Sequence, residues 1–228
     1  MARLLVAIGL TLAGLSAADP SLVAAFDFDE ASGSRVFDAS PFGHRGAAWH
    51  ADRVEGLRGS ALAFVRHDSA VRIPRREQLN LGDQLTLEAW IHPTVADESS
   101  RIIIAKNDEY LLRMDKRPEG GRISFFVHVG SPAVTWEPRV SSKAPPALNA
   151  WHHVVATWDG AMLRLYLDGE LQGETPRTGK SNPNPYPVMI GNFEYPSCHG
   201  TCFGGLIDEV RIYNRALSAA EVEGRYRR

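Results

Sequence analysis

Acidic side chains would have to carry out any glycoside hydrolysis by this protein. Their spacing in the sequence argues against such an activity. A retaining glycosidase needs two carboxyl groups about 5 Å apart. The segment 85–91 carries a single acid, Glu88, while 207–213 carries Asp208 and Glu209 as neighbours. Adjacent residues of a strand point to opposite faces, so we expect no acid pair there. No Gly-x-Ser-x-Gly, phosphate-loop or His-Glu-x-x-His motif occurs either. These residues predict a protein that is not an enzyme.

Aromatic side chains in polar loops indicate a different chemistry, the binding of sugar rings. A large flat ring with a polar edge, placed beside hydrogen-bonding groups, is suited to such a ligand. We identify Trp136, Tyr186, Phe193 and Tyr195 as candidate ligand-binding residues, with Tyr186 inside the proline-rich run 182–187. The alternative is that these rings pack against the neighbouring prolines.

Two cysteines stand close together in the run Cys-His-Gly-Thr-Cys, at Cys198 and Cys202. In an oxidising compartment we expect them to form a disulfide. A ring closed over so few residues removes little entropy from the unfolded chain, so its role would be to fix one loop. A metal site formed by Cys198, His199 and Cys202 is the alternative, although no second ligand pair accompanies it.

The first eighteen residues have the pattern of a secretory signal peptide. Arg3 precedes the uncharged apolar run 4–14, and small residues at 16–18 are followed by Asp19. An apolar run of this length is too short to span a bilayer, and no later segment is long and apolar enough to be a transmembrane helix. We therefore expect a signal peptide at 1–18, one domain at 19–228, and secretion to the extracellular space or the periplasm.

Composition excludes several classes of partner. The 228 residues are 44% hydrophobic and 23% charged, with a net charge of −2. This is typical of a globular domain rather than a disordered chain. Because no long basic run occurs, nucleic acid is not an expected partner.

Most of the chain has the two-residue period of β-strands. Alternating apolar segments occupy 85–91, 122–129, 153–158, 162–167 and 207–213. Asp159-Gly160 and Asp168-Gly169 follow two of them as hairpin turns. Only the tail is expected to be helical, where Ser218 and Glu221 form a capping box. The pattern predicts an all-β fold, a two-sheet antiparallel β-sandwich.

Six separated segments, in this order, resemble the laminin G-like and concanavalin A-like lectin/glucanase jelly-roll family: 26–33 with 38–46, 59–64, 85–93, 151–160, 163–169 and 205–218. The resemblance spans about residues 22–226 and implies a jelly-roll β-sandwich. The same family contains glucanases and alginate lyases, but the Glu-x-Asp-x-x-Glu run of the glucanases is not present in this chain.

The resemblance also implies one structural calcium ion. Asp29, the loop that begins at Asp38, and Asp208 would supply its oxygen ligands if the first and last strands lie side by side. Phe42 stands near the position where the family commonly has an asparagine. The alternative is that these acids are ordinary surface and turn residues.

Together these observations predict a secreted, non-catalytic binding or adhesion module. Its expected partner is carbohydrate, a glycan-rich surface or an extracellular protein. A purely structural protein-interaction domain and a divergent polysaccharide hydrolase or lyase are the alternatives.

Overall fold

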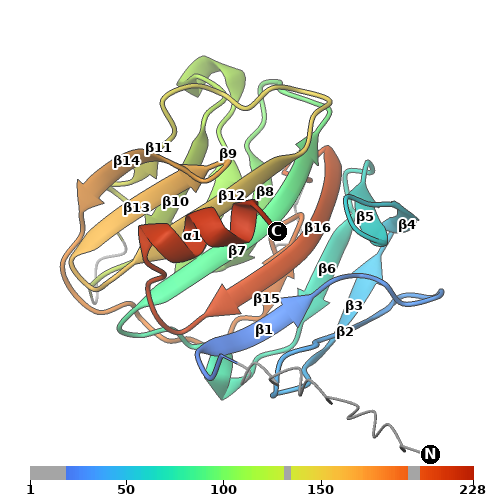
Figure 1. Ribbon diagram of the computed structural model, residues 1–228, viewed down its shortest axis with the longest axis horizontal. Coiled ribbons are helices and arrows are strands. Elements are labelled where there is room, and N and C mark those ends of the chain that lie inside the picture. The colour runs from blue at the N-terminus through green and yellow to red at the C-terminus, as the bar shows by residue number, and fades with distance from the viewer. Residues whose placement is uncertain (1–18, 131–134, 195–200) are drawn as a thin grey trace, which may run out of the picture.

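The computed structural model describes residues 19–130, 135–194 and 201–228, and over these residues the chain forms two antiparallel sheets packed face to face (Figure 1). The predicted signal peptide lies outside the described residues, so secretion stays a prediction. No helix in the described part is long and apolar enough to cross a membrane.

Sheet A carries the last long strand in its interior. In spatial order its strands are β14 (Glu170–Pro176), β13 (Met162–Leu167), β12 (His152–Trp158), β7 (Leu85–Pro93), β16 (Gly205–Tyr213), β5 (Ser60–Phe64) and β4 (Asp52–Glu55), and β1 (Leu22–Phe26) also pairs with β16. The expected juxtaposition of the first and last strands is therefore confirmed.

Sheet B forms the opposite layer. Its strands, in spatial order, are β11 (Val140–Ser141), β10 (Ile123–Val127), β9 (Tyr110–Met114), β8 (Arg101–Lys106), β15 (Val188–Ile190), β6 (Ala70–Ile73), β3 (Arg45–Trp49) and β2 (Arg35–Phe37). Two 3₁₀ turns, η1 (Glu77–Leu79) and η2 (Arg117–Glu119), lie in its connections.

The core lies between the sheets because every strand turns alternate apolar side chains inward. Phe26, Phe125 and Trp158 are fully buried in one cluster that draws on both sheets. The predicted all-β jelly-roll sandwich is confirmed. Asp168 (φ 52°) and Gly169 (φ 80°) close the β13–β14 hairpin with the left-handed backbone that such turns require.

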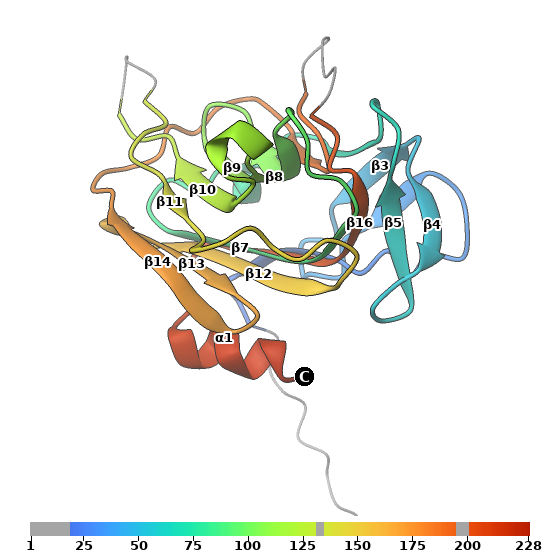
Figure 2. The same ribbon diagram turned by 90° about the horizontal axis from the view of Figure 1, so that it is seen from above.

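The chain ends in α1 (Ala219–Tyr226), which lies against the outer side of sheet A (Figure 2). The predicted capping box is present, because the Ser218 hydroxyl accepts from the Glu221 N–H and the Glu221 carboxylate accepts from the Ser218 N–H. Val222 and Leu217 pack onto Val155 of the sheet, so α1 covers this face.

Candidate functional site

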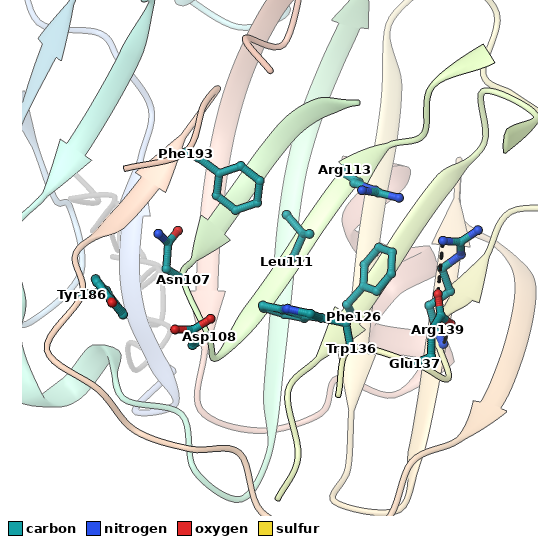
Figure 3. Close-up of a pocket in the computed structure, with 10 residues that line it drawn as sticks. All are labelled: Asn107, Asp108, Leu111, Arg113, Phe126, Trp136, Glu137, Arg139, Tyr186 and Phe193. Atoms are coloured by element: carbon teal, nitrogen blue, oxygen red, sulfur yellow. Dashed lines mark hydrogen bonds and ion pairs between the residues drawn. The ribbon is translucent and has the colours of Figure 1, made fainter. Parts of the chain in front are cut away.

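A pocket of about 550 Å³ opens on the outer face of sheet B, on the side away from α1. Its lining residues are Asn107, Asp108, Leu111, Arg113, Phe126, Trp136, Glu137, Arg139, Tyr186 and Phe193, shown in Figure 3. We call it the sheet B pocket. Its volume lies within the range of about 300–1,000 Å³ typical of small-molecule sites.

Three of the four aromatic residues singled out from the sequence line this one pocket. Trp136 and Phe193 approach it from different loops, and Tyr186 lies beyond the turn that contains Asp108 (Figure 3). Tyr195 falls outside the described residues, and its role stays a prediction. Loops that are far apart in the chain thus bring their rings to a common point.

Strand pairing supplies the floor of the pocket. Phe126 on β10 lies directly opposite Leu111 on β9. Their neighbours Phe125 and Leu112 belong to the inner core, so both floor residues must face outward. The Trp136 ring meets Phe126 edge to face, with 6.3 Å between ring centroids.

Two arginines flank the floor. The guanidinium carbons of Arg113 and Arg139 lie 4.9 and 5.4 Å from the centroid of the Phe126 ring, within cation–π range. Carboxylates hold both: Arg113 Nε donates to Asp115 Oδ1 (2.8 Å), and Arg139 lies 3.3 Å from Glu137. The arginines are therefore fixed in position and electrically compensated.

The opposite wall is the turn between β8 and β9. Asp108 has a left-handed backbone (φ 57°), and its carbonyl accepts a hydrogen bond of 2.8 Å from His128 Nδ1. The Asn107 carbonyl accepts from the Asn184 amide (2.8 Å), which joins this turn to the loop of Tyr186. Within the described part of the chain, the buried Asn107 Oδ1 has no hydrogen-bond partner.

Lys106, which sequence analysis did not single out, anchors this wall from below. It is fully buried, and its Nζ donates to Glu109, to Asn80 Oδ1 (2.6 Å) and to the Asn184 carbonyl (3.2 Å). Burial lowers the pKa of Lys106 and raises that of Glu109. A lysine that ends a strand gives no sign in the sequence that it is buried.

Glu88, the acid of segment 85–91, lies buried beside His153 on sheet A, on the face that α1 covers. Glu88 accepts from His153 Nε2 (3.0 Å) and from the Tyr213 hydroxyl (3.2 Å), and Arg225 of α1 lies 3.7 Å away. Burial opposes ionisation of Glu88, but the hydrogen bond from His153 and the charges around it lower its pKa. These contacts tie α1 to the sheet.

The three aspartates expected to hold calcium are each engaged with protein donors. Asp38 is buried and accepts from the N–H groups of Ala25 (2.7 Å) and Ser40 (2.8 Å), among others. Asp208 accepts from the Leu57 N–H (3.0 Å), and Asp29 accepts from Ser60 N–H (2.7 Å) in the same turn.

Burial raises the pKa of Asp208 to about 6. The strand register shifts between Asp208 and Arg211, so the strict alternation assumed for Asp208 and Glu209 does not hold at this bulge. Among the described residues, no three His, Cys, Asp or Glu side chains form a metal-ligand group. Calcium binding through Asp29, Asp38 and Asp208 stays a prediction.

Cys202 is buried, and its Sγ lies 3.3 Å from the Phe64 carbonyl. Burial raises the pKa of its thiol. Cys198 and His199 lie outside the described residues, so the disulfide and the alternative metal site stay predictions.

The two sheets and an outer-face pocket lined with aromatic rings define a jelly-roll β-sandwich with a candidate ligand site. Residues 66–223 match the model of the concanavalin A-like lectin/glucanases superfamily, and the chain belongs to this family. A search of curated proteins found no match.

Solved structures show the same fold at low sequence identity. The binding domain of Paraclostridial Mosquitocidal Protein 1 has a TM-score of 0.70 at 15% identity, over 90% of this chain and 52% of that one. Domain 4 of AbnA, a GH43 extracellular arabinanase from Geobacillus stearothermophilus, in complex with arabinotriose, has a TM-score of 0.68 at 19% identity, over 90% and 97%.

The binding domain of Botulinum Neurotoxin DC in complex with SialylT has a TM-score of 0.69 at 12% identity, over 91% of this chain and 51% of that one. The present chain thus spans about half the length of these toxin binding domains.

Proposed function

We propose that this protein is a secreted, non-catalytic module that binds an uncharged oligosaccharide in the sheet B pocket. One observation carries the proposal: Trp136, Phe193 and Tyr186 converge from separate loops on a pocket whose lining also includes amide and charged side chains. Flat rings stack against the apolar faces of sugars, and side-chain amides and charged groups bond their hydroxyls.

The charges of the pocket favour an uncharged ligand. Its lining includes two arginines and two acids, so their formal charges cancel. Asp115 and Glu119 lie behind Arg113, with the Glu119 carboxylate 2.9 Å from the guanidinium. An anionic sugar would have to displace these carboxylates, whereas a hydroxyl can join the existing hydrogen bonds as donor or acceptor.

The wall of the sheet B pocket contains a buried hydrogen-bond acceptor without a partner among the described residues. A buried acceptor that lacks a partner costs about 1–3 kcal/mol. Asn107 Oδ1 is such an atom in the described structure, and Asn107 lines the pocket. A ligand hydroxyl that reached this oxygen would therefore gain a hydrogen bond without displacing a protein partner.

Similar folds support a binding role rather than catalysis. Two of the similar structures are toxin binding domains, and another is an arabinanase domain in complex with arabinotriose. The family also contains glucanases by its description, so the absence of catalysis is part of the proposal. Incubation with the bound polysaccharide should release no reducing ends.

Calorimetric titration with uncharged oligosaccharides, arabinotriose among them, tests the proposal. Trp136→Ala should weaken binding about tenfold or more, because stacking on an aromatic ring contributes about 1.4 kcal/mol or more. Trp49→Ala is the matched control, because Trp49 is 46% exposed on β3 and does not line the pocket. Equal losses in the two variants, or no binding by the unaltered protein, would refute the assignment.

A further inference from the structure

A second concavity, of about 350 Å³, lies near the other end of sheet B. It is lined by Phe42, Gly43, His44, Arg45, Arg76 and Gln78. We call it the Arg45 pocket. The first four residues lead into β3, and the last two lie at η1 after β6. Strands β8, β15 and β6 separate β3 from β9, so this concavity is distinct from the sheet B pocket.

The charge of the Arg45 pocket is not compensated. Arg45 and Arg76 are exposed, and within the described ranges neither forms an ion pair. The Arg76 guanidinium donates to the backbone carbonyl of Arg75 (3.0 Å). In the sheet B pocket, by contrast, Arg113 and Arg139 both lie against carboxylates. The same side-chain type thus occurs in two opposite electrostatic settings on one sheet.

Two acids lie near the Arg45 pocket, Asp38 and the exposed Glu77 between Arg76 and Gln78, and among the described residues neither forms an ion pair with its arginines. Asp38 Oδ2 lies 3.8 Å from His44 Nε2, but Asp38 is buried and accepts from the His44 N–H (3.0 Å) and the Ser40 hydroxyl (2.7 Å). His44 Nε2 in turn donates to the Val23 carbonyl (3.1 Å). These bonds keep the carboxylate inward and hold the imidazole rigidly at the pocket wall.

An exposed ring completes the pocket. Phe42 stacks on the fixed His44 ring, with 5.9 Å between centroids and 7° between planes. Phe42 is 44% exposed, so the stack presents a flat apolar surface beside two guanidinium groups. A guanidinium pairs with a planar oxyanion through two parallel hydrogen bonds. The fitting ligand therefore combines a compact ring with an anionic group.

We propose that the Arg45 pocket binds the carboxylate or sulfate group of an acidic saccharide, whose ring packs on Phe42. The site is independent of the uncharged-sugar site, and either proposal can fail without the other. Because the protein carries a net charge of −2, general attraction for anions does not account for such binding.

Titration of the full chain with three hexasaccharides tests this site: hexagalacturonate, a heparin-derived hexasaccharide and uncharged cellohexaose. Arg45→Gln and Arg76→Gln should each weaken binding of an anionic hexasaccharide about tenfold, the loss expected for one charge-assisted contact. Arg75→Gln is the matched control, because Arg75 is exposed, adjacent and outside the lining. It should change binding by less than about twofold.

The two anionic ligands distinguish the sources of the charge, a uronate or a sulfate. Trp136→Ala should leave anionic binding intact and weaken only the uncharged ligand, which separates this site from the sheet B pocket. The proposal is wrong if neither anion binds, if Arg75→Gln weakens binding as much as Arg76→Gln, or if Trp136→Ala abolishes anionic binding. Circular dichroism checks that each variant is folded. If Arg45→Gln disturbs β3, the result for Arg76→Gln alone decides between the outcomes.

Discussion

The two outer faces of the sandwich carry similar apolar clusters but cover them differently. On sheet A, Val155 and Tyr166 lie under Leu217 and Val222 from the C-terminal segment, so the chain closes this face itself. On sheet B, the described residues that border the cluster around Leu111 include the half-buried rings of Trp136 and Phe193. Over the described residues, the cluster under Leu217 and Val222 is therefore core, whereas the cluster beside Trp136 and Phe193 lines a pocket.

The buried polar groups of the two faces have different partners. On sheet A, Glu88 has His153 and Tyr213 as hydrogen-bond partners beneath α1. On sheet B, the side-chain oxygen of Asn107 has no partner in the described part of the chain. On sheet A too, His153 Nδ1 is buried without a partner among the described residues, so the faces differ in what covers them and not in how fully their polar groups are paired.

The largest expected effect on stability comes from breaking the polar network around Glu88 on the outer face of sheet A, which α1 covers and which we call the closed face. Glu88→Ala leaves His153 and Arg225 without their buried carboxylate, and removing one partner of a buried charged pair costs about 3–5 kcal/mol. Urea denaturation should show this loss in the free energy of unfolding. A loss below about 1 kcal/mol would mean that the network does not stabilise this face.

The next largest loss of stability should come from the apolar contacts between the C-terminal segment and sheet A. Leu217→Ala removes a buried side chain from beneath α1 and should lower the free energy of unfolding by about 2–4 kcal/mol. Affinity for an uncharged oligosaccharide should not change, because Leu217 lies on the other face. Coupled loss of affinity would show that the two faces are not independent.

On the outer face of sheet B, a substitution in the pocket should change sugar affinity more than stability. Trp136→Ala should change the free energy of unfolding by about 1 kcal/mol or less while it weakens sugar binding. The same urea series, with Leu217→Ala as the comparison, measures this. Destabilisation equal to that of Leu217→Ala would show that Trp136 is part of the core and not a binding residue.

The smallest expected effect is the dependence of stability on low pH through Glu221. The hydrogen bonds from Arg215 lower the pKa of Glu221 to about 2 from its ordinary 4.5. A carboxyl with a lower pKa in the folded state stabilises it above pH 4.5, and this contribution is lost as the pH falls toward 2. Because Glu221 is partly exposed, we expect less than about 1 kcal/mol. Unfolding at pH 5 and pH 3 should differ less in Glu221→Gln than in the unaltered protein, and equal differences would contradict the prediction.

The strands, the hairpins and the helix cap could be predicted because their signals are local. Alternation in 85–91 and the Asp168-Gly169 turn depend only on neighbouring residues. Three of the four described aromatic residues of the sheet B pocket could also be proposed, since Trp136, Tyr186 and Phe193 stand in loops rich in polar residues or proline.

The rest of the pocket depends on strand register, which the sequence does not specify. Pairing of β10 with β9 sets Phe126 beside Leu111, and the Asp115 carboxylate positions Arg113. Lys106 is buried only because Glu109 and the Asn184 carbonyl meet it there. These are contacts between residues that acquire partners only after the sheets have formed.

The place of β16 has a consequence for how sheet A is assembled. It follows the other strands of sheet A along the sequence, yet it lies between β7 and β5 in the middle of the sheet. Without β16, the other described strands of sheet A fall into three parts, β14-β13-β12-β7, β5-β4 and β1 alone, with unpaired edges facing the gap. Such edges readily pair with other chains, and distant pairings of this kind fold slowly. A chain that stopped before β16 would thus have three separate sets of sheet A strands with unpaired edges instead of a shorter sandwich.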